Sequence, residues 1–123
     1  QKLTPLIATT NETCITITTA LKQAVFESPQ EQSLLKDACD NLFAQINGLH
    51  MHINCGANLV TNKQKKQTFD CLFTLQSHLQ ETTQALQNLI DNKSAENIAT
   101  INTKTEALIP LIDQLIIPQA ASN

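Results

Sequence analysis

Apolar residues recur at every third or fourth position in four stretches of the chain, the spacing that is typical of amphipathic α-helices. The first stretch begins at Thr9, where Glu12 completes a capping box. Each stripe needs a partner that buries it, so the pattern predicts four helices packed together. In chain order, the stripes are Cys14, Ile17, Leu21, Ala24 and Val25; Leu34, Leu35, Ala38, Cys39, Leu42, Phe43 and Ile46; Phe69, Leu72, Leu75, Leu79, Leu86 and Leu89; and Ile98, Ile101, Leu108, Ile112 and Leu115.

The connection between the first two predicted helices carries the clearest helix-start signal of the sequence. Ser28 is a preferred N-cap residue, Pro29 suits the first helical position, and Glu31 completes a capping box. The second helix is therefore expected to begin directly after Ser28.

The end of the second helix is less clear. Asn47-Gly48 could stop it, but Leu49 and Ile53 keep the helical spacing in phase, so we extend the helix to about Cys55. The same segment alternates in polarity as a strand does. A single strand would have no partner in this chain, which favours the helix.

The last two helices have clearer limits. The third is predicted from about Lys63 to Asp91, and Ser94 is expected to cap the fourth. Pro110 lies inside the fourth helix and should kink or split it, because proline removes a backbone donor and clashes with the preceding turn. Pro118 is expected to end it.

The composition agrees with an all-α, antiparallel four-helix bundle that forms a single domain over residues 1–123. Two Gly and four Pro leave little room for a turn-rich β fold. The net charge of −3 and the absence of Trp and Tyr argue against nucleic-acid binding. No run of 18 apolar residues is present, so we expect at most peripheral contact with a membrane. We also expect a monomer.

The four cysteines indicate the cellular compartment in which the protein is expected to lie. None lies in a C-x-x-C pair, and an even number in a short chain is typical of two disulfides formed in an oxidising environment. The sequence begins at Gln1 without Met, as a mature form does after signal-peptide removal. The chain is therefore expected to be secreted or periplasmic.

Three pairings of these cysteines are possible, and helix geometry favours one. Reflecting the first helix onto the second across the turn near Ser28 brings Cys14 to the level of Cys39. A Cys39–Cys55 bridge would join two positions of one helix about 24 Å apart. We therefore predict Cys14–Cys39 and Cys55–Cys71, each contributing roughly 2–4 kcal/mol to stability.

The strongest candidate for a binding site is a lysine cluster. Lys63, Lys65 and Lys66 lie in the first turns of the third helix, where the helix dipole favours anions rather than cations. A bound phosphate would offset that repulsion. His50 and His52 should lie at the same end of the bundle and add positive charge below about pH 6.5. The pattern predicts a site for an anionic headgroup, such as that of a phosphoinositide.

The competing interpretation is a solvated helix start, in which Lys66 pairs with Asp70 four residues further on. The sequence alone leaves both interpretations open.

Metal-binding and catalytic sites have less support in the sequence. His50 and His52, with Cys55 nearby, suggest a metal, but residues two apart on a helix diverge by about 200°. Asp37 and Asp40 lie one turn apart, as exposed carboxylates commonly do. His78, on the flank of the third helix, is expected to lie at the surface. No nucleophile–base set or glycine-rich loop is present, so we expect no enzyme, metal or cofactor.

The fourth helix is apolar on more than one face. The apolar residues beyond the one stripe that a bundle core needs could contact a protein or lipid partner, or they could pack beneath the N-terminal residues. The surplus residues are Ile109, Leu111, Ile116 and Ile117, and the N-terminal residues are Leu3, Leu6 and Ile7.

The absence of Arg, with many Asn, Gln, Ile and Thr residues, resembles the small type II-exported proteins of Legionella-type intracellular bacteria. This resemblance covers composition and no motif, and it implies a host-facing partner and a role in virulence. Plant invertase and pectin-methylesterase inhibitors are also four-cysteine helical bundles, but their cysteine spacing differs from these positions.

Two functions follow as hypotheses. The first is a secreted binding protein whose lysine cluster engages an anionic lipid headgroup. The second is an interaction or inhibitor protein that docks a host protein through a helix face, with the fourth helix as the candidate. Electrostatic headgroup binding should weaken as the salt concentration rises, whereas a hydrophobic protein contact should not.

Overall fold

The protein consists of four packed helices, which confirms the predicted all-α class. The computed structural model describes residues 3–54 and 62–121, with side chains for residues 6–51, 66 and 69–115. No strand occurs within these ranges. The helices are α1 (Leu3–Gln23), α2 (Pro29–Asn54), α3 (Asn62–Asp91) and α4 (Ala95–Ala121).

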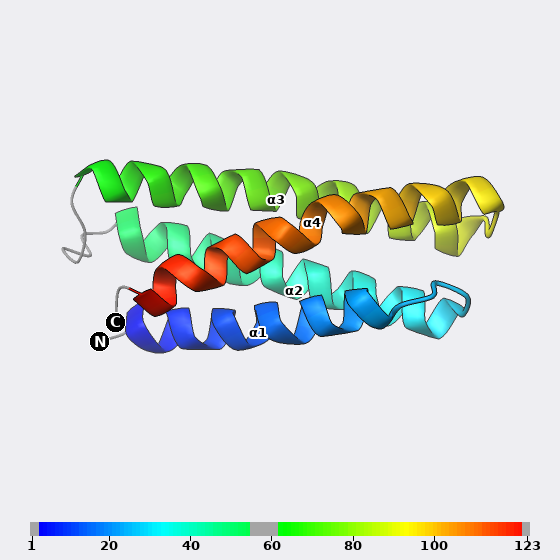
Figure 1. The fold of residues 1–123 in the computed structure, drawn as a ribbon, viewed down its shortest axis with the longest axis horizontal. Helices are drawn as coiled ribbons and strands as arrows, with labels where there is room; N and C mark the ends of the chain where they lie inside the picture. The colour runs from blue at the N-terminus through cyan, green and yellow to red at the C-terminus, as the bar shows by residue number, and fades with distance from the viewer. Residues whose placement is uncertain (1–2, 55–61, 122–123) are drawn as a thin grey trace.

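The helices form a ring in which sequence neighbours are also spatial neighbours. In Figure 1, consecutive helices run in opposite directions along the long axis. α2 and α3 pack together, α3 packs on α4, and α1 closes the ring against both α2 and α4. The α1–α2 and α3–α4 connections therefore lie at one end of the bundle (Figure 1). α2 ends and α3 begins at the other end of the bundle.

The core is almost entirely aliphatic and comes from the predicted stripes. The prediction of burial was wrong for two stripe residues, Val25 and Leu34, which are exposed. Val25 lies after the end of α1. Leu34 is exposed because its neighbour Leu35 faces the core, and adjacent positions on a helix differ in direction by about 100°. The buried leucines and isoleucines are Ile17, Leu21, Leu35, Leu42, Ile46, Leu49, Leu72, Leu75, Leu79, Leu86, Leu89, Ile101, Leu108, Ile112 and Leu115.

α1 begins at Leu3, six residues before the predicted start at Thr9. Leu6 and Ile7 pack against the core, so the helix gains buried apolar surface by extending towards the N-terminus. Thr10 is buried, and its hydroxyl donates to the carbonyl of Leu6 at 2.8 Å. Thr9 is an interior helix residue, whose carbonyl accepts the hydroxyl of Thr13 at 3.1 Å.

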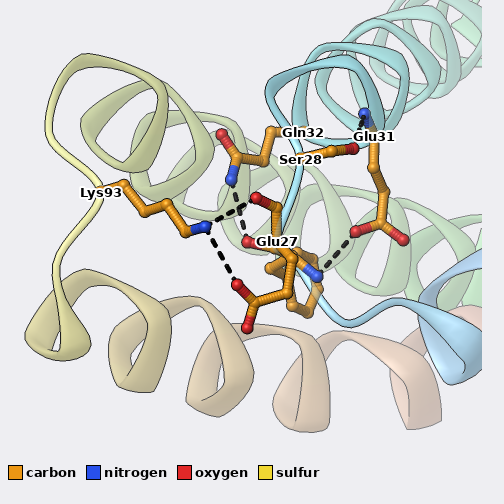
Figure 2. A network of polar contacts seen from close by, with 6 residues as sticks. Glu27, Ser28, Glu31, Gln32 and Lys93 are labelled. Carbon is orange, nitrogen blue, oxygen red and sulfur yellow. Dashed lines mark hydrogen bonds and ion pairs between the residues drawn. The ribbon is translucent and has the colours of Figure 1, made fainter.

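The predicted start of α2 is confirmed. The Ser28 hydroxyl accepts a hydrogen bond from the backbone N–H of Glu31 at 3.1 Å, as an N-cap does. The Glu31 carboxylate reaches back past the cap and accepts from the N–H of Phe26 at 2.7 Å (Figure 2). The Gln32 amide donates to the carbonyl of Phe26 at 2.9 Å. Side chains of the first turn of α2 therefore hold both backbone polar groups of Phe26.

Phe26 has a left-handed backbone, with φ of 60°. This conformation is unfavourable for a residue with a Cβ. The ring is 1% exposed, so its burial and the two hydrogen bonds offset that cost.

The α3–α4 connection is tied to the same turn. Lys93 donates to the carbonyl of Glu27 at 2.9 Å and pairs with the Glu27 carboxylate at 3.0 Å (Figure 2). These contacts link the two connections at this end of the bundle. Both side chains are at least half exposed, so the ion pair itself adds little stability.

α2 and α3 follow their predicted courses. α2 passes through Gly48 without a break and ends at Asn54. A Cβ on Gly48 would meet Leu6 at 3.7 Å, an ordinary contact, so α1 and α2 pack closely here. α3 covers Asn62–Asp91, against a predicted start near Lys63.

α4 is one continuous helix, so of the two outcomes predicted at Pro110, a kink or a split, the split is excluded. Pro110 is exposed, and so is Glu106, whose carbonyl loses its helical donor. Water can reach that carbonyl, which offsets the loss of its helical hydrogen bond. Ser94 caps α4 as predicted, accepting from the N–H of Asn97 at 3.1 Å. The helix continues to Ala121, so the predicted end at Pro118 was also wrong.

The predicted Cys14–Cys39 disulfide was wrong as well. Both side chains are fully buried, and both are free thiols. Equal height on antiparallel helices does not suffice, because the two Cβ atoms must also point towards each other across the helix interface. A disulfide needs Cα atoms within roughly 7 Å. Cys71 is also a free thiol, and its predicted partner Cys55 lies outside the described residues.

Burial makes the thiols of Cys14 and Cys39 unreactive. It raises the pKa of Cys39 to about 12, and burial together with the charge of Asp113 raises the pKa of Cys14 to about 12. The thiolate is the reactive form, so both cysteines are expected to resist oxidation and alkylation in the folded protein.

The first prediction concerns the α2 cap. Ser28→Ala should lower the free energy of unfolding by about 1 kcal/mol, because the N–H of Glu31 loses its acceptor. Ser33→Ala, at an exposed interior position of the same helix, is the control and should leave stability unchanged or slightly higher. Urea denaturation followed by circular dichroism measures both. Equal effects of the two substitutions would contradict the cap.

The second prediction concerns the thiols. Iodoacetamide without reductant should leave Cys14 and Cys39 unmodified in the folded protein and label both in denaturant. Half-buried Cys71 should react before them in the folded state. Peptide mapping by mass spectrometry identifies the labelled positions. If Cys14 and Cys39 were labelled in denaturant only after reduction, the two residues would be bridged after all.

Candidate functional site

The lysine cluster lies on the first two turns of α3, whose first turn contains no acidic residue. Lys66 is highly exposed, and its ammonium pairs with the Asp70 carboxylate at 3.1 Å, as the competing interpretation predicted. An exposed pair of this kind is worth less than about 1 kcal/mol, so an incoming anion can compete for Lys66. The side chains of Lys63 and Lys65 lie outside the described residues.

His50 occupies a different environment from the one predicted. Its side chain is only 9% exposed and lies between α2 and α3. The imidazole stacks on Phe73 and Phe69, with ring centroids 4.4 and 5.3 Å away and interplanar angles of 25° and 20°. The sequence suggested a solvent-facing charge here, but the ring belongs to an aromatic layer.

A hydrogen-bond network fixes the His50 ring. The Gln76 amide nitrogen donates to the Asn47 side chain at 2.9 Å and to the Phe43 carbonyl at 3.3 Å. Its oxygen therefore faces His50 Nε2, 3.2 Å away, and must accept from it. This assigns the proton to Nε2 and makes Nδ1 an acceptor. Nδ1 is buried and has no hydrogen-bond partner in the part of the chain that the structure describes.

Burial lowers the pKa of His50, and the hydrogen bond to Gln76 opposes this shift only in part. His50 is therefore neutral at pH 7 and adds no positive charge to the lysines. The side chain of His52, the other predicted histidine, lies outside the described residues.

Large apolar side chains near this histidine reach the surface: Phe73 stacks on its ring, and Met51 follows it on α2. Met51 is 66% exposed and Phe73 is 58% exposed. Phe69 and Phe43 are half-buried and pack against the core. We name the group of Phe43, His50, Met51, Phe69 and Phe73 the α2–α3 face.

The α2–α3 face continues into the lysine cluster. Lys66 precedes Phe73 by seven residues, which is nearly two full turns, so the two positions share one side of α3. The spacing of Phe69 and Phe73 (i, i+4), and of Phe43, Asn47 and His50 (i, i+4, i+7), could have revealed this face from the sequence.

A second surface feature is a groove of about 500 Å³ between α3 and α4. Lys104 pairs with Glu81 across it at 2.8 Å and holds the pKa of that carboxyl below its usual range. Glu81 therefore stays ionised at neutral pH and cannot donate a proton. The groove contains no nucleophile–base pair; it is lined by Ser77, Gln80, Glu81, Gln84, Ala85, Asn88, Thr100 and Lys104.

The structure also places the two carboxylates of α2 and part of the apolar surplus of α4. Asp37 is exposed, and Asp40 is paired with Lys36 at 3.3 Å. On α4, Ile109 and Leu111 are half-buried and pack against the core. Ile116 and Ile117 have side chains outside the described residues. Within the described part of α4, the apolar surplus therefore contributes to packing.

The described residues contain neither a metal-type cluster nor a membrane-spanning helix. No group of three His, Cys, Asp or Glu side chains comes together there as a metal site would require. Within the same ranges, none of the helices has the length and apolarity needed to cross a membrane.

Comparison of the chain with protein-family models, with curated proteins and with solved structures found no significant match.

The third prediction concerns His50. His50 titrates near pH 6.5 in the unfolded chain and at a lower pH in the folded chain. Between these two pH values, the unfolded chain therefore binds more protons at His50. Stability due to the neutral ring is complete above pH 6.5 and is lost as the pH falls through that window. His50→Gln should flatten this part of the stability curve. Urea denaturation of both proteins between about pH 4.5 and 8 tests this, and parallel curves would contradict it.

Proposed function

We propose that the protein is a non-enzymatic binding protein that engages anionic, phosphate-bearing lipid headgroups, such as those of phosphoinositides, through Lys63, Lys65 and Lys66. The observation that carries the proposal is the position of the exposed Lys66 on the same side of α3 as the exposed Phe73. A cationic group beside an apolar surface is the combination that peripheral membrane contact requires.

The charge distribution supports the same function. Three of the eight basic residues lie within four positions, in a chain whose net charge is −3. No acidic residue occupies the first turn of α3, and the nearest described carboxylate partner, Asp70, is itself exposed. An anion at this end would meet lysine side chains and the positive end of the α3 dipole together.

His50 plays a smaller part than the sequence suggested. His50 is buried and neutral, so the lysines must supply the charge at neutral pH. Export from the cytoplasm, and a role at a host surface, are part of the proposal on sequence grounds. Buried thiols with a raised pKa can remain reduced in an oxidising compartment, so free Cys14 and Cys39 are consistent with export.

Docking of a host protein on a helix face is the alternative. Exposed Ile15, Val25 and Leu34 are apolar residues outside the α2–α3 face that such a partner could cover. Binding of this kind would not depend on the lysines and would persist at high salt.

The fourth prediction separates the two functions. Vesicles of neutral lipid, with or without a few per cent phosphoinositide, are sedimented with the protein at rising salt. Binding should require the anionic lipid and weaken as the screening length falls from about 10 Å at 0.1 M to about 3 Å at 1 M salt. The triple variant Lys63→Ala, Lys65→Ala, Lys66→Ala should bind on the order of 100-fold more weakly, at about 1 kcal/mol per lysine.

The matched control removes three other lysines. Lys22→Ala, Lys36→Ala, Lys104→Ala loses the same charge from positions along α1, α2 and α4. It should keep most of the affinity, because headgroup contact depends on where the charges lie. Equal losses in the two triple variants would show that net charge alone governs binding, and the proposed site would be wrong.

A further inference from the structure

We propose that Phe73 and Met51 insert into the acyl boundary of the membrane whose headgroups the lysines contact, so that the partner is a bilayer surface and not a soluble phosphate. This inference rests on the proposed function and specifies its partner. It starts from two large apolar side chains that are more than half exposed, Met51 at 66% and Phe73 at 58%.

The position of Phe73 relative to the lysines suits a helix that lies along a membrane. Lys66 and Phe73 share one side of α3 and are about 10 Å apart along its axis. With α3 parallel to the membrane plane, Lys66 can extend its long side chain to the phosphates while the Phe73 ring lies deeper. Phe69, on the same side, is half-buried beneath them and supports this surface.

The ring stack beneath Phe73 contains a polar atom that lacks a hydrogen-bond partner in the described part of the chain. The His50 ring lies 4.4 Å from the Phe73 ring, and its Nδ1 is a buried acceptor without a partner in the described part of the chain. Buried acceptors of this kind are rare because they forfeit a hydrogen bond to water. When Phe73 turns outward into lipid, interfacial water can reach Nδ1. That hydrogen bond offsets part of the stacking energy that is lost.

Charge complementarity selects an anionic bilayer as the occupant. A soluble phosphate would satisfy the lysines but leave Phe73 and Met51 in water. A neutral apolar partner would cover these two side chains but gain nothing from Lys66, which is 79% exposed. An anionic membrane presents both chemistries at the spacing that α3 provides.

The sequence contains no Trp, so a single introduced Trp reports on one position. Phe73→Trp is titrated with vesicles of neutral lipid containing phosphoinositide, prepared with or without brominated acyl chains. Its emission should shift to shorter wavelength and be quenched by the brominated lipid. Val25→Trp is the matched control. Val25 is similarly exposed, at 64%, but lies in the connection at the other end of the bundle (Figure 1), so its emission should not change.

A second pair of measurements keeps the two proposals separable. Met51→Ser, Phe73→Ser should bind these vesicles on the order of tenfold more weakly, since apolar burial is lost. The same variant should bind soluble inositol phosphate as the unmodified protein does. Circular dichroism should show an unchanged fold, because both residues are exposed.

Each outcome bears on one proposal. If the lysine triple variant bound vesicles normally, the proposed function would fail. If that variant lost binding while the emission of the Phe73→Trp variant stayed unshifted and the double-serine variant bound normally, the contact would be electrostatic only. Insertion would then be rejected, and the proposed function would stand. Equal quenching of both tryptophan variants would also reject insertion at this face.

Discussion

Burial of one apolar stripe from each helix is the constraint on which the rest of the structure depends. α1 is rich in threonine, a poor helix former, and would not hold together as an isolated peptide. Its threonine hydroxyls bond back to carbonyls one turn earlier, so Thr10 and Thr18 can lie inside without unpaired groups. The helices therefore exist because they share a core, and each contributes a face that the others cover.

Much of the fold could be predicted from sequence because its signals are local. Ser28 and Ser94 act within three residues of themselves, and both proved to be caps. The start of α1 and the continuity of α4 depend on tertiary context instead. Thr9 resembles a cap until Leu6 and Ile7 are seen to pack on the core. The effect of Pro110 depends on whether water reaches the carbonyl it leaves unpaired.

The candidate site was predictable only in part, for a similar reason. Lysines on the first turns of a polar helix remain at the surface in almost any packing, and Lys66 does so. The environment of His50 is decided by Phe69, Phe73 and Gln76, which come from another helix. Likewise, Cys14 and Cys39 could be placed at one height from their numbers. The distance between their backbones is a property of helix packing, which their positions in the sequence do not specify.

The left-handed turn at Phe26 has a consequence for the bundle as a whole. Four amphipathic helices with similar stripes can be arranged in two mirror-related winding senses, and aliphatic packing alone distinguishes them poorly. A turn with one unusual dihedral angle, held by Glu31 and Gln32, restricts the directions in which α2 can leave α1. Because these contacts span only five or six residues, the winding sense can be selected early, before the distant contact between α1 and α4 closes the ring.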